Sequence, residues 1–99
     1  MDNFIPLNGS PELQEEAVKQ IASLQEFPIH ELRFEWEENV LVLAQYDPFI
    51  SPLLRVNVGL KDRKEWIRYI YISREMMKDI EFVKQIIQDE IDFAKKEYE

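Results

Sequence analysis

The sequence of 99 residues contains no cysteine, only two glycines and a single histidine. Without cysteine the chain has no disulfide, no thiolate ligand for zinc and no thiol nucleophile. Gly9 and Gly59 are too few and too far apart to form a phosphate-binding loop or the glycine pattern of dinucleotide-binding domains. These absences exclude thiol chemistry and argue against nucleotide-dependent catalysis.

The single histidine, His30, offers little catalytic chemistry. A transition-metal site built from histidines usually needs at least two of them, and no serine of this chain lies in a nucleophile-elbow setting. We therefore expect no metal, no cofactor and no catalytic residue. His30 precedes the first predicted strand, so we expect it at a strand edge, in contact with Tyr46.

Long apolar runs are also missing. The longest, such as residues 40–44, are far shorter than the ~20 residues needed to span a bilayer. Residues 1–8 lack the basic start and the apolar stretch of a signal peptide. We therefore expect a soluble, cytoplasmic protein with no membrane contact.

The composition is that of a folded, acidic domain. Hydrophobic residues make up 45% of the chain, more than disordered sequences contain, and 20 acidic against 12 basic residues give a net charge of −8. Residues 1–99 are enough for one domain and too few for two. Residues 1–9 show no periodicity and are predicted to form an irregular N-terminal arm.

Two segments carry helix signals. The first, residues 11–25, follows the candidate N-cap Ser10 and places its apolar residues on one narrow face. The second runs from the candidate N-cap Asp79 to about Tyr98, after a short turn that opens at Ser73. We expect its main apolar stripe to face the sheet. This stripe consists of Ile80, Val83, Ile87, Ile91, Ala94 and Tyr98.

Four segments between the helices are predicted to be strands. Residues 31–37 alternate between apolar and charged side chains, which is typical of a strand with one wet face. Residues 40–46 are apolar at nearly every position, as in a strand buried on both faces. A third strand is predicted at residues 53–60, after a proline-containing loop. A charged turn joins it to a fourth strand at residues 65–73.

The predicted order of elements is therefore α-β-β-β-β-α. A four-stranded antiparallel meander with both helices packed on one face would bury the main apolar stripes of all these elements. We accordingly expect an α+β fold, a two-layer sandwich. This order of elements recurs in many unrelated small domains, so it implies no function.

The pairing of the first two strands stays open. A three-residue loop would set Phe34 opposite Val42, whereas a two-residue loop would set it opposite Leu43. Both loops are compatible with the residues between the strands.

For the second hairpin we expect Leu60 to face Glu65, with Trp66 covering Gly59. One face of the hairpin then carries Leu54, Val56, Val58, Ile67, Tyr69 and Tyr71. The other face, which we expect to point outward, carries Arg55, Asn57, Gly59, Trp66, Arg68 and Ile70.

Glu35 and Glu37 are the carboxylate pair best placed for acid–base chemistry. Both are predicted on the wet face of the first strand, about 6.5 to 7 Å apart by strand rise. Solubility alone requires alternating charges on such a face, and no desolvated pocket is predicted beside them. We therefore expect them to pair with Arg55 and Arg68 across the sheet, and we expect the protein not to be an enzyme.

The basic residues are concentrated in one segment. Residues 55–78 carry seven bases and three acids, a net charge of +4 in a chain whose total is −8. Repulsion between the acidic protein and phosphates argues against direct nucleic-acid binding. The acidic helices leave one alternative function open, a nucleic-acid mimic that inhibits a DNA-binding protein. A small-molecule-binding domain is another.

Apolar residues outnumber the places available in one two-layer core. A second apolar stripe on the last helix, about 120° from the first, consists of Phe82, Ile86 and Phe93. Exposed apolar patches of this size usually mark interfaces on soluble domains. The alternative is that the first helix and the apolar residues of the N-terminal arm cover this second stripe.

We therefore expect a non-enzymatic intracellular protein that acts by binding another protein, as an inhibitor, an immunity factor or an adaptor, and that can also form a homodimer. The residues expected to contact the partner lie in the proline-containing loop and on the outer face of the sheet. They are Phe49, Ile50, Arg55, Trp66 and Arg68.

Overall fold

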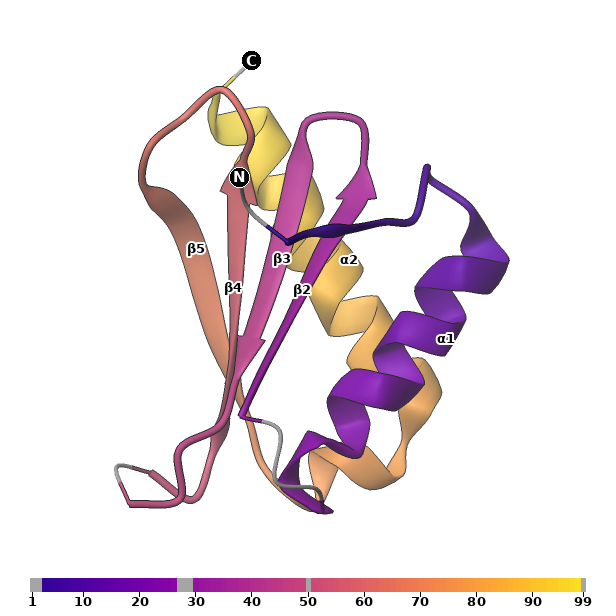
Figure 1. Ribbon diagram of the computed structural model, residues 1–99, viewed down its shortest axis with the longest axis vertical. Coiled ribbons are helices and arrows are strands. Elements are labelled where there is room, and N and C mark those ends of the chain that lie inside the picture. Colours follow the sequence, from indigo (N-terminus) through magenta and orange to yellow (C-terminus); the bar gives the residue numbers. More distant parts are fainter. Residues whose placement is uncertain (1–2, 27–29, 50, 99) are drawn as a thin grey trace.

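The computed structural model describes residues 3–26, 30–49 and 51–98. Its elements are β1 (Ile5–Pro6), α1 (Pro11–Ala22), β2 (Glu31–Glu37), β3 (Val40–Gln45), β4 (Leu54–Leu60), β5 (Trp66–Ile72) and α2 (Ile80–Glu97), with short 3-10 helices at Leu24–Glu26 and Met76–Lys78. The strands form one sheet in the order β1-β2-β3-β4-β5, and α1 and α2 pack on the same face of it (Figure 1). The prediction of an α+β fold is confirmed.

The prediction of four strands is wrong, because the N-terminal arm supplies a fifth. Ile5 and Pro6 pair in parallel with Phe34 and Glu35 of β2. The backbone N–H of Leu7 donates to the carbonyl of Glu35 over 2.8 Å, and the Leu7 side chain is buried in the core. A strand of two residues has no periodicity, so the sequence pattern could not indicate it.

Both helices begin where the capping residues predict. Ser10 Oγ accepts a hydrogen bond from a first-turn N–H at 3.3 Å, and Asp79 Oδ1 does the same at 3.1 Å. α1 ends at Ala22 rather than near residue 25, and the chain continues there as a 3-10 helix. Within the described ranges, neither helix is long and apolar enough to cross a bilayer.

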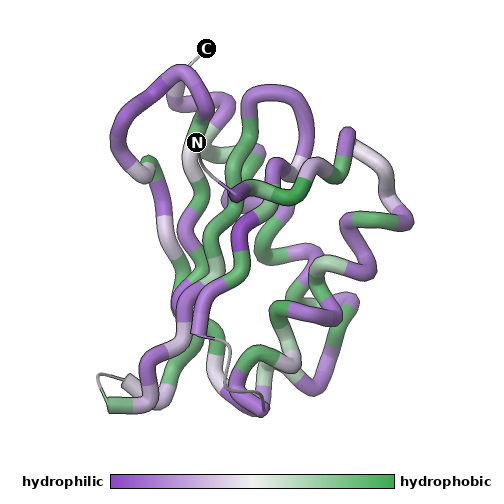
Figure 2. The backbone as a smooth tube through the Cα atoms, in the orientation of Figure 1, coloured by the Kyte–Doolittle hydropathy of each residue, from purple (hydrophilic) through white to green (hydrophobic). Residues whose placement is uncertain are grey.

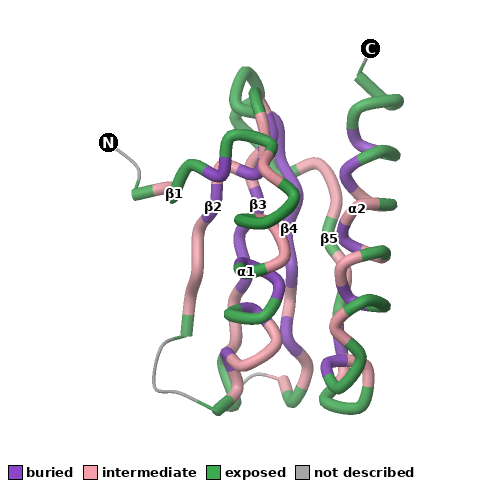
Figure 3. Tube along the Cα trace, turned by 90° about the vertical axis from the view of Figure 1, so that its right-hand side faces the viewer, coloured by how far each residue is buried: buried purple, intermediate pink, exposed green. Residues whose placement is uncertain are grey.

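The core lies between the sheet and the two helices. Hydrophobic residues recur along the strands and along one side of each helix (Figure 2), and β4 is buried over most of its length whereas β5 is largely not (Figure 3). The helix residues buried in this core are Ala17, Val18 and Ile21 of α1 and Val83, Ile87, Ile91 and Ala94 of α2. The main stripe of α2 therefore faces the sheet through these four residues, while Tyr98 at its end is exposed.

The β2–β3 hairpin combines the two registers that the sequence left open. Phe34 lies opposite Val42, as a three-residue loop requires, whereas Glu37 lies opposite Val40 across a two-residue turn. Trp36 is the extra residue of a β-bulge between these pairs, and its side chain is buried in the core. The bulge turns the end of β2, so that Glu37 lies on the helix side of the sheet.

The register of β4 and β5 differs from the predicted one. Val58 lies opposite Arg68 but Gly59 lies opposite Trp66, so Ile67 is an extra residue in a second bulge. Past this bulge the predicted faces of residues 68–71 are reversed. The outer face of β5 carries Trp66, Tyr69 and Tyr71, and the helix face carries Arg68, Ile70 and Ile72.

The expected contact between Trp66 and Gly59 is confirmed, and it makes a testable prediction. A Cβ atom at position 59 would lie 2.7 Å from Cε3 of Trp66. Gly59→Ala is expected to lower the free energy of unfolding by about 1 kcal/mol. This loss is at the low end of the range for overpacked sites, because the Trp66 ring is 40% exposed and can shift outward. Urea denaturation measures this loss. In a Trp66→Ala background, Gly59→Ala should not lower the free energy of unfolding. An equal loss of stability in both backgrounds would show that the Trp66 ring is not the cause.

Candidate functional site

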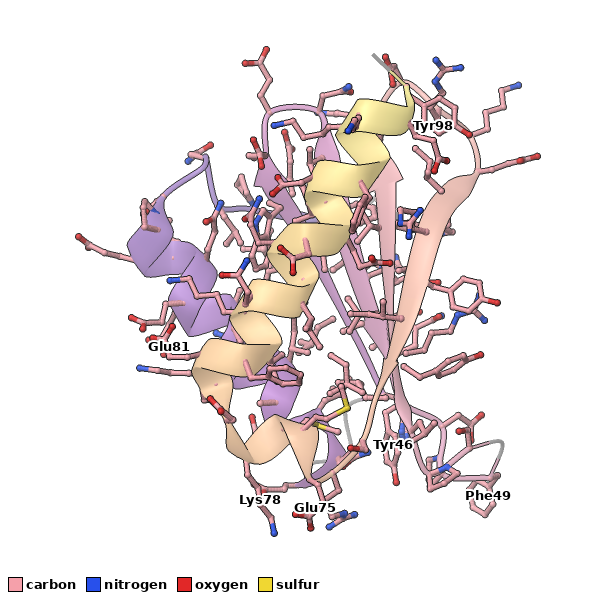
Figure 4. All side chains as sticks on the ribbon, turned by 180° about the vertical axis from the view of Figure 1, so that it is seen from behind. Tyr46, Phe49, Glu75, Lys78, Glu81 and Tyr98 are labelled. Carbon is pink, nitrogen blue, oxygen red and sulfur yellow. The ribbon has the colours of Figure 1, made fainter. Side chains whose placement is uncertain are left out.

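Exposed apolar side chains gather on both sides of β5. Among the described residues, nine large hydrophobic side chains are exposed, and five of these flank β5. The five are Trp66, Tyr69 and Tyr71 on its outer side and Phe82 and Phe93 on α2. In Figure 4, which views the molecule from the helix side, β5 is the outermost strand beside α2. The apolar surplus inferred from the sequence is thus concentrated at one edge of the sheet.

The outer side of β5 is a row of aromatic rings. Tyr69 and Tyr71 meet edge to face with their centroids 5.6 Å apart. The guanidinium carbon of Arg55 lies 4.4 Å from the centroid of the Tyr69 ring. Arg55 therefore lies on the outer face with Trp66, as predicted, but it contacts a tyrosine rather than the glutamates of β2.

Arg68 lies on the opposite side of the sheet from its predicted place. Its Nε lies 3.2 Å from Glu90 Oε1 and its Nη1 lies 3.3 Å from Glu97 Oε1, both on α2. Its guanidinium carbon is 5.1 Å from the centroid of the Phe93 ring. The expected pairing of Arg68 with the β2 glutamates is therefore wrong, and Arg68 ties β5 to α2 instead.

The helix side of β5 is flanked by the second apolar stripe of α2. Phe82 and Phe93 are separated by eleven residues, close to three helical turns, so both point the same way. They are 44% and 54% exposed, and Ile86 between them is half-buried against the core. The N-terminal arm does not cover this stripe, because Phe4 lies across the other face with its ring centroid 6.4 Å from that of Trp66.

β5 is the last strand of the sheet, so one row of its backbone N–H and C=O groups has no strand partner within the described ranges. Proteins commonly protect such an edge with a bulge or with a charged side chain that points inward. The first half of β5 has both, the bulge at Ile67 and the inward Arg68. The second half, residues 69–72, has neither. This half, with Tyr69 and Tyr71 on its outer side and Phe82 and Ile86 on its helix side, is named here the β5 edge.

The helix flank of the β5 edge is acidic. At about 100° per residue, Glu90 and Glu97 project within about 40° of Ile86, and Asp79 caps the start of the same helix, where its Oδ1 accepts a hydrogen bond from the Phe82 N–H. Arg68 is paired with two of them, so three carboxylates and one guanidinium leave a charge of −2. No lysine of α2 falls within that arc. A ligand at this flank meets aromatic rings beside negative charge.

The two glutamates considered for acid–base chemistry point to different partners on opposite faces. Glu35 lies 3.5 Å from Lys61 Nζ on the outer face, whereas Glu37 lies 3.3 Å from Lys95 Nζ of α2. His30 Nδ1 is 3.0 Å from the carbonyl oxygen of Tyr46, the contact expected for it. In the part of the chain that the structure describes, no group of three His, Cys, Asp or Glu residues could hold a metal ion.

The structure does not bring the predicted loop residue Phe49 together with the predicted sheet residue Trp66. Phe49 is 97% exposed in the loop that leads into β4, whereas Trp66 lies opposite Gly59 near the end of β4. The two therefore lie at opposite ends of the sheet. Ile50 lies outside the described residues. Sequence reasoning missed Tyr69 and Tyr71 as surface residues, although the place of their strand at the end of a meander does indicate an edge.

The sequence matches no protein-family model. Comparisons with curated proteins and with solved structures also give no significant match. The geometry and charge of the β5 edge are therefore the basis for assigning a function.

Proposed function

We propose that this chain is a non-enzymatic protein-binding domain, of the inhibitor or adaptor type, that accepts an extended segment of a partner protein as a sixth strand beside β5. The observation that carries this proposal is the unprotected strand edge at residues 69–72, lying between two rows of exposed aromatic side chains. In strand addition, main-chain hydrogen bonds supply affinity and alternate side chains supply specificity. Alternate residues of the added strand would contact Tyr69 and Tyr71 on one side, and Phe82 and Ile86 on the other.

The charge of the helix flank favours a basic partner over a second copy of this chain. Asp79, Glu90 and Glu97 outnumber Arg68 there, and the whole chain carries −8. Two copies joined edge to edge would bring like charges together, whereas lysine or arginine at the inward positions of a partner strand would meet opposite charge. The charge of this flank therefore disfavours a homodimer, which is the competing arrangement.

A fluorescein-labelled peptide of alternating lysine and valine tests this proposal. Fluorescence anisotropy should show that Phe82→Lys weakens binding by about fivefold, because the change replaces an apolar contact with like charge. Leu13→Lys introduces the same charge at an exposed residue of α1, which packs beside β2 on the far side of the strand order from β5, and should leave the affinity unchanged. Equal affinities of the wild type and Phe82→Lys would contradict the proposal.

A second peptide with the same side chains, N-methylated at alternate amides, tests main-chain pairing. Methylation removes the donors that would bind the strand edge, so this peptide should bind about tenfold more weakly. Hydrogen exchange should slow at the amides of residues 69–72 only with the unmodified peptide. Equal binding of the two peptides, or dimers of the wild type in light scattering that dissociate when the edge is mutated, would refute a basic partner strand.

A further inference from the structure

A hollow of about 650 Å³ lies on the outer face of the sheet, beside the turn between β4 and β5. Leu41 and Leu43 of β3 and Gly59 of β4 line it, and Phe4 of the N-terminal segment borders it. Figure 1 shows this segment crossing in front of the sheet at that end. The volume is within the range of small-molecule sites, about 300 to 1,000 Å³.

One wall of the hollow is apolar and flat. The ring of Trp66 rests on Gly59, and the ring of Phe4 is tilted by 44° against it at a centroid distance of 6.4 Å. Leu41 and Leu43 extend this wall along the neighbouring strand. A planar aromatic ring packs well on such a surface, because offset-stacked and tilted ring contacts are both favourable.

The remaining border of the hollow is cationic. The charged residues that line it are Arg33, Glu35, Lys61, Arg63, Lys64 and Glu65. Four cations against two carboxylates give a local charge of +2, in a chain whose total is −8. Lys61 is weakly engaged, 3.5 Å from Glu35, and Lys64 has no ion-pair partner among the described residues. Clustered charges of one sign beside a concave surface concentrate ligands of the opposite sign.

We propose that this hollow binds a small molecule that combines a planar aromatic ring with an acidic group, a carboxylate, sulfonate or phosphate. The ring packs on Trp66 and Leu43, and the acidic group meets Lys61 and Lys64. A long polyanion does not fit, because the acidic remainder of the chain repels it. The site is separate from residues 69–72, so either proposal can fail without the other.

Two dyes with the same ring system test this site on the full chain. The sulfonate dye 1-anilinonaphthalene-8-sulfonate should bind about fivefold more tightly than N-phenyl-1-naphthylamine, which lacks the acidic group. Replacing Lys61 and Lys64 together by methionine should weaken the sulfonate dye about tenfold and change the neutral dye less than about twofold. The matched control, Lys84→Met with Lys96→Met on α2, makes the same change in net charge and should leave both dyes unaffected. Fluorescence titration measures the affinity of each dye for the wild type and for the two double variants.

The apolar wall is tested by Trp66→Ala, which should weaken both dyes, because each packs its rings on this side chain. Thermal unfolding of each variant, followed by circular dichroism, verifies that it remains folded. Unchanged binding in Trp66→Ala, or equal effects of the two lysine pairs on the sulfonate dye, would place the dye elsewhere and overturn the proposal.

Discussion

Replacing Phe34 with alanine is expected to lower the free energy of unfolding by about 3 to 5 kcal/mol. Phe34 is 2% exposed in β2, where it lies between Ile5 of β1 and Val42 of β3. Removal of the ring leaves a cavity in a close-packed core that relaxes only partly. Because domains of this kind are stable by about 5 to 15 kcal/mol, the urea midpoint should fall by a large fraction.

The chain contains a matched control for this change. Phe49→Ala removes the same atoms from a side chain that is almost fully exposed, so its effect should stay within about 0.5 kcal/mol. Urea denaturation followed by tryptophan fluorescence measures both variants, since Trp36 is buried in the core. A loss smaller than about 1 kcal/mol for Phe34→Ala would contradict the burial of its ring between sheet and helices.

The burial of Phe34 follows from the sequence, because residues 31–37 alternate strictly and only one side of such a strand is apolar. The helix starts at Ser10 and Asp79 were equally predictable, since each capping side chain accepts a hydrogen bond from the first turn. These features depend on residues close together in the chain. Local signals therefore determine most of the architecture.

The two β-bulges could not be predicted from the sequence. Neither Trp36 nor Ile67 differs from an ordinary strand residue, and each becomes the extra residue only because of how its neighbours pack. Each bulge reverses the faces of the residues beyond it, since strand side chains alternate with a period of two. Glu37 and Arg68 consequently lie on the helix side, which removes the carboxylate pair and the predicted cross-sheet ion pairs.

The path of the N-terminal arm was unpredictable for a different reason. Asn8 and Gly9 adopt positive φ values of 54° and 70°, and these turn the chain from β1 into α1. The rest of the arm is held by contacts with residues distant in sequence, such as that of Phe4 with Trp66. The hollow on the outer face depends on this path, so no local pattern could indicate it. The exposed aromatic residues on α2 were predictable, because helical spacing alone separates them from the buried stripe.

Replacing Arg68 with methionine is expected to lower the free energy of unfolding by about 2 kcal/mol. The guanidinium of Arg68 donates to both carboxylate oxygens of Glu90, over 3.2 and 3.5 Å, and to Glu97 over 3.3 Å. The side chain of Glu90 is only 14% exposed, so water replaces the lost donors poorly. Methionine keeps an apolar stem beside Phe93, so the loss mainly reports the removed charge. Denaturant unfolding at neutral pH measures it.

Adding Glu90→Gln to Arg68→Met separates charge from packing. The double variant should regain about half of the lost stability, because a neutral amide beside methionine leaves no poorly hydrated charge. A double variant no more stable than Arg68→Met alone would show that the loss does not come from an unpaired carboxylate at Glu90. Arg68 is also the inward charge that restricts strand addition to residues 69–72. Its removal extends the segment of β5 open to pairing and leaves the helix flank more acidic, so the peptide of alternating lysine and valine should bind Arg68→Met more tightly than the wild type.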